Sequence, residues 1–120
     1  MSDQPLTPNA VAAQLAELAR QLDKLVVAID EAEKTAVNAR EDYTMTYAAA
    51  FLSAEGSMDI RRHLATERTH DTRLAAELAE QTVKGIRRQI DSVRIRIDVG
   101  RSLGAALRAE AGLAGSGYQP

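Results

Sequence analysis

Apolar residues recur every three or four positions along the first half of the chain. They form a first seam made of Leu15, Leu18, Leu22, Leu25, Ile29, Ala32, Ala36, Ala39, Tyr43, Tyr47, Ala50 and Ala54. Alternating steps of three and four are the heptad pattern of helices that pack along their length. One extra step of four, from Tyr43 to Tyr47, is a stutter in that pattern. The first half of the chain is therefore predicted to be a single helix.

The ends of the predicted helices carry recognisable signals. Thr7 followed by Pro8 suits a helix start, because a hydroxyl can cap the helix and proline has the φ of its first position. Gly56 suits a helix end, because glycine readily adopts the left-handed conformation found there. Ser57 or Asp59 can then cap a second helix. The sequence predicts one domain with a helix over 8–54, a turn over 55–57 and a helix over 58–111, between flexible tails at 1–7 and 112–120.

The second half of the chain carries its own seam. It is made of Ile86, Ile90, Val93, Ile97, Gly100, Gly104, Leu107 and Ala111, with Leu64, Leu74 and Leu78 as a looser extension toward the turn. If the chain folds back at residues 55–57, seam residues whose numbers sum to about 115 face each other. The pairs predicted in this way are Leu18–Ile97, Leu22–Val93, Leu25–Ile90 and Ile29–Ile86. The predicted fold is all-α, an antiparallel hairpin of two helices.

The stretch VRIRIDV, residues 93–99, alternates apolar and polar residues as a β-strand does. No other segment reads as a strand that could pair with it, and an unpaired strand is unstable. As a helix, the stretch places Val93 in the seam and leaves a second apolar line made of Ile95, Val99 and Leu103. This line would be exposed in a lone hairpin, so we predict that the hairpin self-associates through these three residues.

Glycine is costly inside a helix, and Gly100 and Gly104 both lie on the second seam. Two interpretations remain open. The glycines either allow the two helices to approach closely, or they form a flexible joint near the end of the second helix.

The composition narrows the possible classes of function. Aromatic residues make up 3%, and there is no Trp and no Cys, so a thiolate metal site or a cysteine nucleophile is excluded. The first residues, MSDQPLTP, show no signal peptide, and no apolar run is long enough to cross a membrane. We find no phosphate-binding glycine loop and no nucleophile motif. We therefore expect a soluble, intracellular protein without catalytic residues, cofactor or membrane partner.

Charge is divided unevenly along the chain. Residues 1–59 hold four Lys or Arg against ten Asp or Glu, whereas residues 84–120 hold seven against three. Four arginines of the basic part recur every seven residues, which is two helical turns, so they form one stripe beside the seam. This stripe is made of Arg87, Arg94, Arg101 and Arg108. Such a stripe can neutralise phosphates, and the candidate nucleic-acid-binding residues are Lys84, Arg87, Arg88, Arg94, Arg101 and Arg108.

The same arginines allow a second interpretation. Charged residues that flank a heptad seam often form ion pairs across a coiled-coil interface. In that case the stripe would bind acidic residues of a neighbouring chain, and the protein would be a structural or protein-binding coiled coil.

The polar segment at 61–73 contains His63, Glu67 and His70 on one helical face. Glu67 and His70 match the Glu-x-x-His pattern of di-iron helical bundles. The favoured interpretation is a solvated polar face without a metal. A metal-binding bundle is the third possible class of function.

Residues 31–58, EAEKTAVNAREDYTMTYAAAFLSAEGSM, resemble a pattern in small helical proteins encoded in phage replication and recombination gene clusters. The matching elements are Ala39, Tyr43, Tyr47, Ala48, Ala54, Gly56 and Ser57, followed by Arg61 or Arg62. The resemblance continues through residues 99–110, VGRSLGAALRAE, and covers roughly half of the chain in all.

More distantly, residues 36–47 and 108–112 are similar to the recombination mediator of T-even phages. The chain differs from that family in being acidic overall and in lacking a lysine-rich N-terminal arm. The resemblance implies a non-enzymatic helical oligomer that binds single-stranded DNA and contacts a recombinase or another phage DNA-processing protein. It also implies a location in the cytoplasm of a bacterial host.

Overall fold

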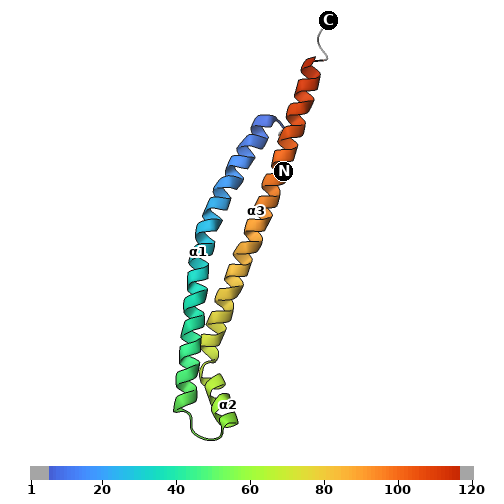
Figure 1. The fold of residues 1–120 in the computed structure, drawn as a ribbon. Coiled ribbons are helices and arrows are strands. Elements are labelled where there is room, and N and C mark those ends of the chain that lie inside the picture. The colour runs from blue at the N-terminus through green and yellow to red at the C-terminus, as the bar shows by residue number, and fades with distance from the viewer. Residues whose placement is uncertain (1–5, 117–120) are drawn as a thin grey trace. The chain divides into compact units, whose positions relative to one another are not determined.

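The computed structural model describes residues 6–116, and every regular element among them is a helix (Figure 1). The helices are α1 (Pro8–Ser53), α2 (Met58–Arg68) and α3 (His70–Ser116). The predicted all-α helical hairpin is therefore confirmed. The stretch at residues 93–99 lies within α3 and is helical, as predicted.

The signals at the helix ends act as the sequence predicts. The Thr7 hydroxyl accepts a hydrogen bond of 3.1 Å from the Ala10 amide and caps α1. The Ser57 hydroxyl accepts one of 3.3 Å from the Ile60 amide and caps α2. Gly56 has a φ of +114°, a conformation that side chains rarely allow, so glycine is needed at this turn.

The predicted single helix over 58–111 is wrong, because Thr69 separates α2 from α3. Thr69 has φ −109° and ψ 15°, outside helical values. Its hydroxyl donates a hydrogen bond of 2.6 Å to the carbonyl of Ala65, and the hydroxyl of Thr72 donates one of 3.0 Å to the carbonyl of Thr69. Threonine hydroxyls that bind nearby backbone carbonyls can bend helices, but Thr44 and Thr82 make the same hydrogen bond inside the unbroken α1 and α3, so this bond accompanies the break at Thr69 and does not by itself explain it.

The predicted C-terminal boundary at residue 111 is also wrong, since α3 runs to Ser116. Gly112 and Gly115 do not take a positive φ, so neither ends the helix. Of the predicted tails, Leu6 and Thr7 are outside the helix, whereas residues 1–5 and 117–120 lie outside the described residues.

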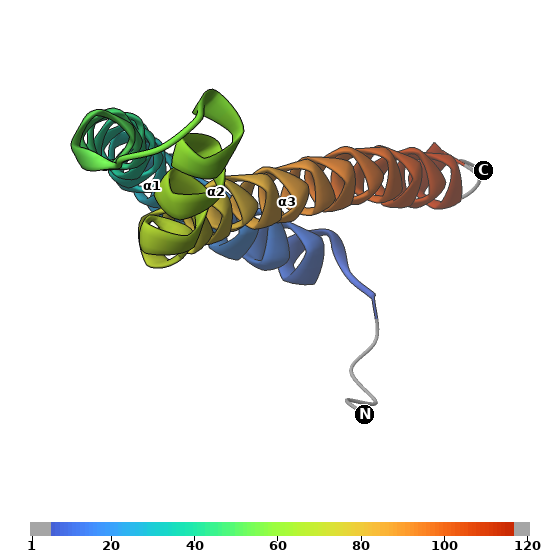
Figure 2. The same cartoon turned by 90° about the horizontal axis from the view of Figure 1, so that it is seen from below.

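The helices form two compact units, whose boundaries fall inside α1 and α3. Within residues 6–116, unit 1 comprises the start of α1 up to Val26 together with α3 from Arg88 onward. Unit 2 comprises residues 27–87, with the rest of α1, all of α2 and the start of α3. Figure 1 shows α1 and α3 side by side and antiparallel in each unit, and Figure 2 shows the chain crossing from α1 through α2 into α3 in unit 2.

The seam of unit 1 follows the predicted register. A methyl group built on Gly100 would lie 2.7 Å from Leu15 Cδ2, and one built on Gly104 would lie 3.5 Å from Val11 Cγ1. In both pairs the residue numbers sum to 115, the value predicted for the hairpin. The buried apolar side chains of this unit are those of Val11, Ile90 and Val93.

The seam of unit 2 is built from smaller side chains than predicted. Leu74 and Leu78, which were assigned to the seam, are 43% and 58% exposed, so that assignment is wrong. The buried residues of unit 2 are Ala54, Ala65, Thr69, Ala76 and Val83. From Ala65 onward these residues, together with half-buried Thr72 and Ala79, keep steps of three and four up to Ile86. The heptad is therefore continuous through the helix break, carried by alanine and threonine.

Candidate nucleic-acid interface

One row of charged residues flanks the seam on α3 at intervals of seven residues. Its members are Arg73, Glu80, Arg87, Arg94, Arg101 and Arg108. The row on the same flank of α1 has Ala12, Ala19, Val26, Glu33 and Arg40. Paired helices bring these two flanks together. A charged residue of the α3 row therefore has an ionic partner only where the matching α1 position holds the opposite charge.

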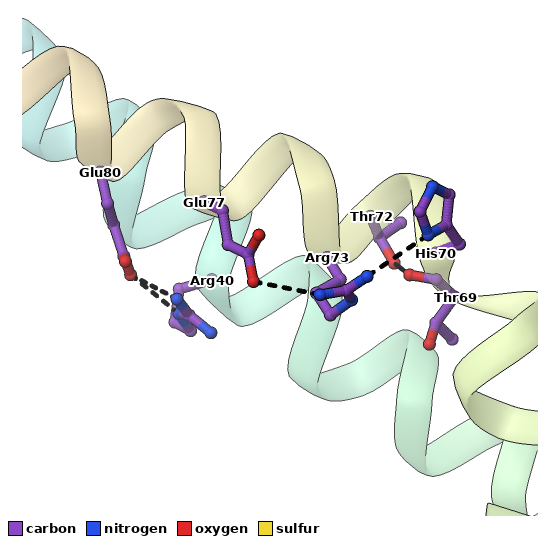
Figure 3. A network of polar contacts seen from close by, with 7 residues as sticks. All are labelled: Arg40, Thr69, His70, Thr72, Arg73, Glu77 and Glu80. Atoms are coloured by element: carbon purple, nitrogen blue, oxygen red, sulfur yellow. Dashed lines mark hydrogen bonds and ion pairs between the residues drawn. The ribbon is translucent and has the colours of Figure 1, made fainter. Parts of the chain in front are cut away.

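In unit 2 the two rows form ion pairs between α1 and α3. Both Nε and Nη2 of Arg40 donate hydrogen bonds to Oε1 of Glu80 (Figure 3), the first of them 3.1 Å long. Arg87 Nη2 donates a hydrogen bond of 3.1 Å to Glu33 Oε1. The hydrogen bond and the negative charge of Glu80 raise the pKa of Arg40 above its ordinary value. Within unit 2, therefore, this flank is electrostatically paired.

The ion-paired residues of unit 2 have numbers that sum to 120 in both cases. The same heptad spacing in unit 1 places Val26, Ala19 and Ala12 of α1 at the positions that match Arg94, Arg101 and Arg108. None of these three α1 residues is acidic. Within residues 6–116, the three arginines form no ion pair. We call Arg94, Arg101 and Arg108 the arginine row.

The nearest acidic residues along α3 do not neutralise the arginine row. Asp91 and Asp98 are three or four residues from Arg94, the spacing of intrahelical pairs. No salt bridge of 4.0 Å or less joins them to an arginine in the described part of the chain. The arginine row is exposed to solvent, and its guanidinium groups are available to an external anion.

The other predicted binding residues are distributed around α3. Arg87 is bound to Glu33 in unit 2, and Lys84 lines a groove there together with both of these residues. Arg88 follows Arg87 by one residue, so it points about 100° away from the row on a helix of 3.6 residues per turn. The structure thus separates the arginine row from Lys84 and Arg87, which belong to unit 2, and from Arg88, which belongs to unit 1 but lies on another face of α3.

The predicted oligomer residues lie on the other flank of the unit 1 seam. Ile95 and Val99 are 63% and 61% exposed, and Leu103 is half-buried. They line an apolar groove of about 430 Å³ with Leu18 and Gln14 of α1. The groove also includes Glu17, Arg96 and Gly100. No member of the arginine row lines it, so one helix pair presents two chemically different surfaces.

One acid and one base lie at the edge of this apolar groove. Glu17 accepts hydrogen bonds of 3.0 and 2.8 Å from Nε and Nη2 of Arg20. These hydrogen bonds and the charge of Arg20 lower the pKa of Glu17, which keeps its carboxylate ionised. Arg96 lines the groove on α3 and makes no salt bridge within residues 6–116.

The three residues considered for a metal site, His63, Glu67 and His70, do not form a cluster. His63 and Glu67 belong to α2, whereas His70 begins α3, and all three are exposed. His70 Nδ1 lies 3.4 Å from Arg73 Nη2, and Nη1 of the same arginine donates a hydrogen bond of 3.3 Å to Glu77 Oε1 (Figure 3). Across residues 6–116, no group of three His, Cys, Asp or Glu side chains is placed to hold a metal ion.

The sequence prediction missed the α1 residues that decide the character of the arginines. Glu33 and Arg40 on one side, and Val26, Ala19 and Ala12 on the other, were not singled out. The signal was present, because the predicted seam register also determines which flanking positions match. Applying the register to the positions that flank the seam matches Arg87 with Glu33 and the arginine row with alanine and valine, and so distinguishes Arg87 from that row.

None of the helices within residues 6–116 has the length and apolar character needed to cross a membrane. No protein-family model, curated protein or solved structure matches the chain. The function must therefore be inferred from the surfaces of the two units.

Proposed function

We propose that the protein is a non-enzymatic oligomer that binds single-stranded DNA through the arginine row. The observation that carries this proposal is the contrast between the units: arginine and glutamate match across the flank in unit 2, whereas the arginines of unit 1 match alanine and valine. Guanidinium groups bind phosphate oxygens through strong, charge-assisted hydrogen bonds. Three arginines spaced by about 10 Å along one helix suit a repeating polyanion.

The biological setting that we propose is phage DNA recombination or replication, with a recombinase or another DNA-processing protein as partner. It rests on the resemblance of residues 31–58 and 99–110 to small helical phage proteins. The second of these segments contains Arg101 and Arg108, so the resemblance and the arginine row coincide on α3. The cytoplasm of the bacterial host is the location that goes with this setting.

We further propose that a second copy of the chain covers the apolar groove formed around Ile95, Val99 and Leu103. A two-fold arrangement brings the same groove of both copies together, which buries like surfaces against each other. It can also place Arg96 of one copy beside Glu17 of the other, so that the charges at the groove edge are complementary. The arginine rows would remain free on the opposite flank.

The alternative function is a structural or protein-binding coiled coil in which the arginine row binds acidic residues of a neighbouring chain. The Arg87–Glu33 pair favours it, since another arginine of the same flanking row already binds a glutamate. The two proposals differ in what happens when the arginines are neutralised. Loss of DNA binding with an unchanged oligomer supports the first, and dissociation of the oligomer supports the second.

The test is a titration of a fluorescently labelled single-stranded oligonucleotide with the protein at several salt concentrations between about 50 and 200 mM. We expect binding that weakens steeply with salt, because each phosphate contact contributes about −0.7 to the slope of log K against log salt. Replacing Arg94, Arg101 and Arg108 together with Gln is expected to reduce the slope by about 2, since three contacts are lost.

The control variant replaces Arg62, Arg68 and Arg73 of unit 2 with Gln, which changes the net charge equally. We expect this variant to bind the oligonucleotide almost as the unchanged protein does. Equal losses in the two variants would mean that only the overall charge matters. An absence of binding at the lowest salt concentration would overturn the proposed function.

A further inference from the structure

At the end of the arginine row, two arginines share one small pocket. Arg101 and Arg108 line a cavity of about 110 Å³ in unit 1 together with Gly104 of α3. Its other walls are Pro8, Val11, Ala12 and Leu15 of α1. The cavity is several times larger than the ~30 Å³ that one water molecule occupies in the liquid.

Among the residues that the structure describes, the lining of this pocket contains two positive charges and no negative one. Neither Arg101 nor Arg108 forms a salt bridge within residues 6–116. Two guanidinium groups beside the same apolar wall repel each other, and an anion between them relieves that repulsion. The α1 wall, formed by Pro8, Val11, Ala12 and Leu15, offers no carboxylate for this purpose.

Gly104 gives the second guanidinium access to the pocket. A methyl group built on Gly104 would lie 3.5 Å from Nη1 of Arg108 and 3.5 Å from Val11 Cγ1. The Arg108 guanidinium therefore lies against the glycine backbone, one helical turn back from its own Cα and toward Arg101. The absence of a side chain at position 104 leaves the floor of the pocket open.

We infer that this pocket, formed by Arg101, Gly104 and Arg108 of α3 against the start of α1, binds one phosphate group. Phosphate offers several oxygens to two guanidinium groups at once, which is the geometry that arginine recognises best. The inference deepens the proposed DNA-binding function, on which it rests for the biological source of the phosphate. It predicts that the arginine row has an anchoring end rather than three equivalent contacts.

The test uses the full chain and follows backbone amide signals by NMR during a titration with inorganic phosphate. A parallel titration with sodium chloride keeps the ionic strength matched. We expect saturable shifts at Gly104 and Ala12 with phosphate and none with chloride. Shifts that fail to saturate, or that are equal for the two salts, would overturn the inference.

Three variants locate the site. Arg101→Gln with Arg108→Gln should weaken phosphate binding at least tenfold, whereas Arg94→Gln, which removes a charge from the same row outside the pocket, should weaken it less than twofold. Gly104→Ala should weaken it several-fold while the helices stay folded, because its methyl group meets only ordinary contacts and narrows the pocket floor. Equal effects of the variants at positions 94 and 101/108 would contradict a defined pocket.

Two further ligands distinguish the source of the phosphate. Thymidine 5′-monophosphate presents a terminal phosphate, and the dinucleotide thymidylyl-thymidine presents an internal phosphodiester. Saturable shifts with either ligand support the pocket, and the tighter one identifies whether strand ends or strand interiors are held. If the oligonucleotide binds but phosphate does not saturate, the pocket is wrong and the proposed function stands. If the shifts saturate with phosphate but the oligonucleotide does not bind, the pocket stands and the proposed function is wrong.

Discussion

At the scale of single residues, Gly100 and Gly104 separate the two interpretations that the sequence leaves open. Leu15 approaches Gly100 so closely that a Cβ there would lie 2.7 Å from its Cδ2. Both glycines are helical and lie within α3, so the close approach of two helices accounts for Gly100 without a joint. Gly104 is buried, but it has room for a methyl group.

This difference predicts opposite consequences for the same substitution. Gly104→Ala should raise the free energy of unfolding by up to about 1 kcal/mol, because alanine favours the helix and its methyl group fits. Gly100→Ala should gain much less or lose stability, since Leu15 must move. Urea unfolding of both variants measures the difference, with Gly112→Ala as the control because nothing lies within 4 Å of that position. Equal stabilities at positions 100 and 104 would contradict the close approach.

At the scale of helices, the sequence predicts α1 well and the start of α3 poorly. Every assigned seam position of α1 is buried or half-buried, because large apolar residues mark it from Leu15 to Ile29. In unit 2 the sequence pattern places Leu74 and Leu78 in the seam, but both are exposed, and the seam contains Thr69, Thr72 and Ala76 instead. Small and polar residues carry little periodic signal, so the buried face was not visible.

The helix break is hard to predict for a related reason. Thr69 occupies a regular heptad position and is only 1% exposed, so the spacing of seam residues is unbroken there and does not mark the boundary between α2 and α3. The break is a departure of the Thr69 backbone from helical φ and ψ, and the hydroxyl-to-carbonyl hydrogen bonds beside it also occur at Thr44 and Thr82 within unbroken helices, so the residue type does not mark it. By contrast, the caps at Thr7 and Ser57 are local in sequence and could be predicted directly.

The cap of α2 yields a prediction at this scale. Ser57→Ala should lower the free energy of unfolding by about 1 kcal/mol, because the Ile60 amide loses its acceptor. Ser57→Asp should keep most of the stability, since aspartate caps helices equally well. Urea unfolding monitored by circular dichroism gives both values. An alanine variant as stable as the unchanged protein would show that the hydroxyl does not stabilise α2.

At the scale of the whole molecule, the two units differ in the balance of basic and acidic residues. Unit 2 holds eight Lys or Arg against eleven Asp or Glu, whereas residues 6–26 and 88–116 of unit 1 hold seven against five. The sequence contains this division and, through the seam register, the flanking positions that match, but the ion pairs themselves are seen only in the structure. The candidate site was therefore predicted in outline, and its composition required the structure.

Self-association through the apolar groove predicts a change of mass in solution. Ile95→Gln with Val99→Gln should shift the protein to a monomer in light scattering, because the shared apolar surface is lost. Both residues are more than 60% exposed, so the fold itself should be little affected. The control is Met45→Gln with Leu52→Gln, which removes two similarly exposed apolar residues from unit 2 and should leave the mass unchanged. A monomeric unchanged protein, or equal effects of both variants, would contradict the proposal.

The placement of the groove and the arginine row on opposite flanks of one seam has a consequence for valency. In a dimer formed through the groove, each copy contributes one row, and a strand that spans both rows makes its second attachment without a second loss of translational freedom. The gain depends on whether the strand is long enough to reach, so affinity should rise sharply at a threshold length and then level off. A monomeric variant would keep the first attachment and lose that threshold.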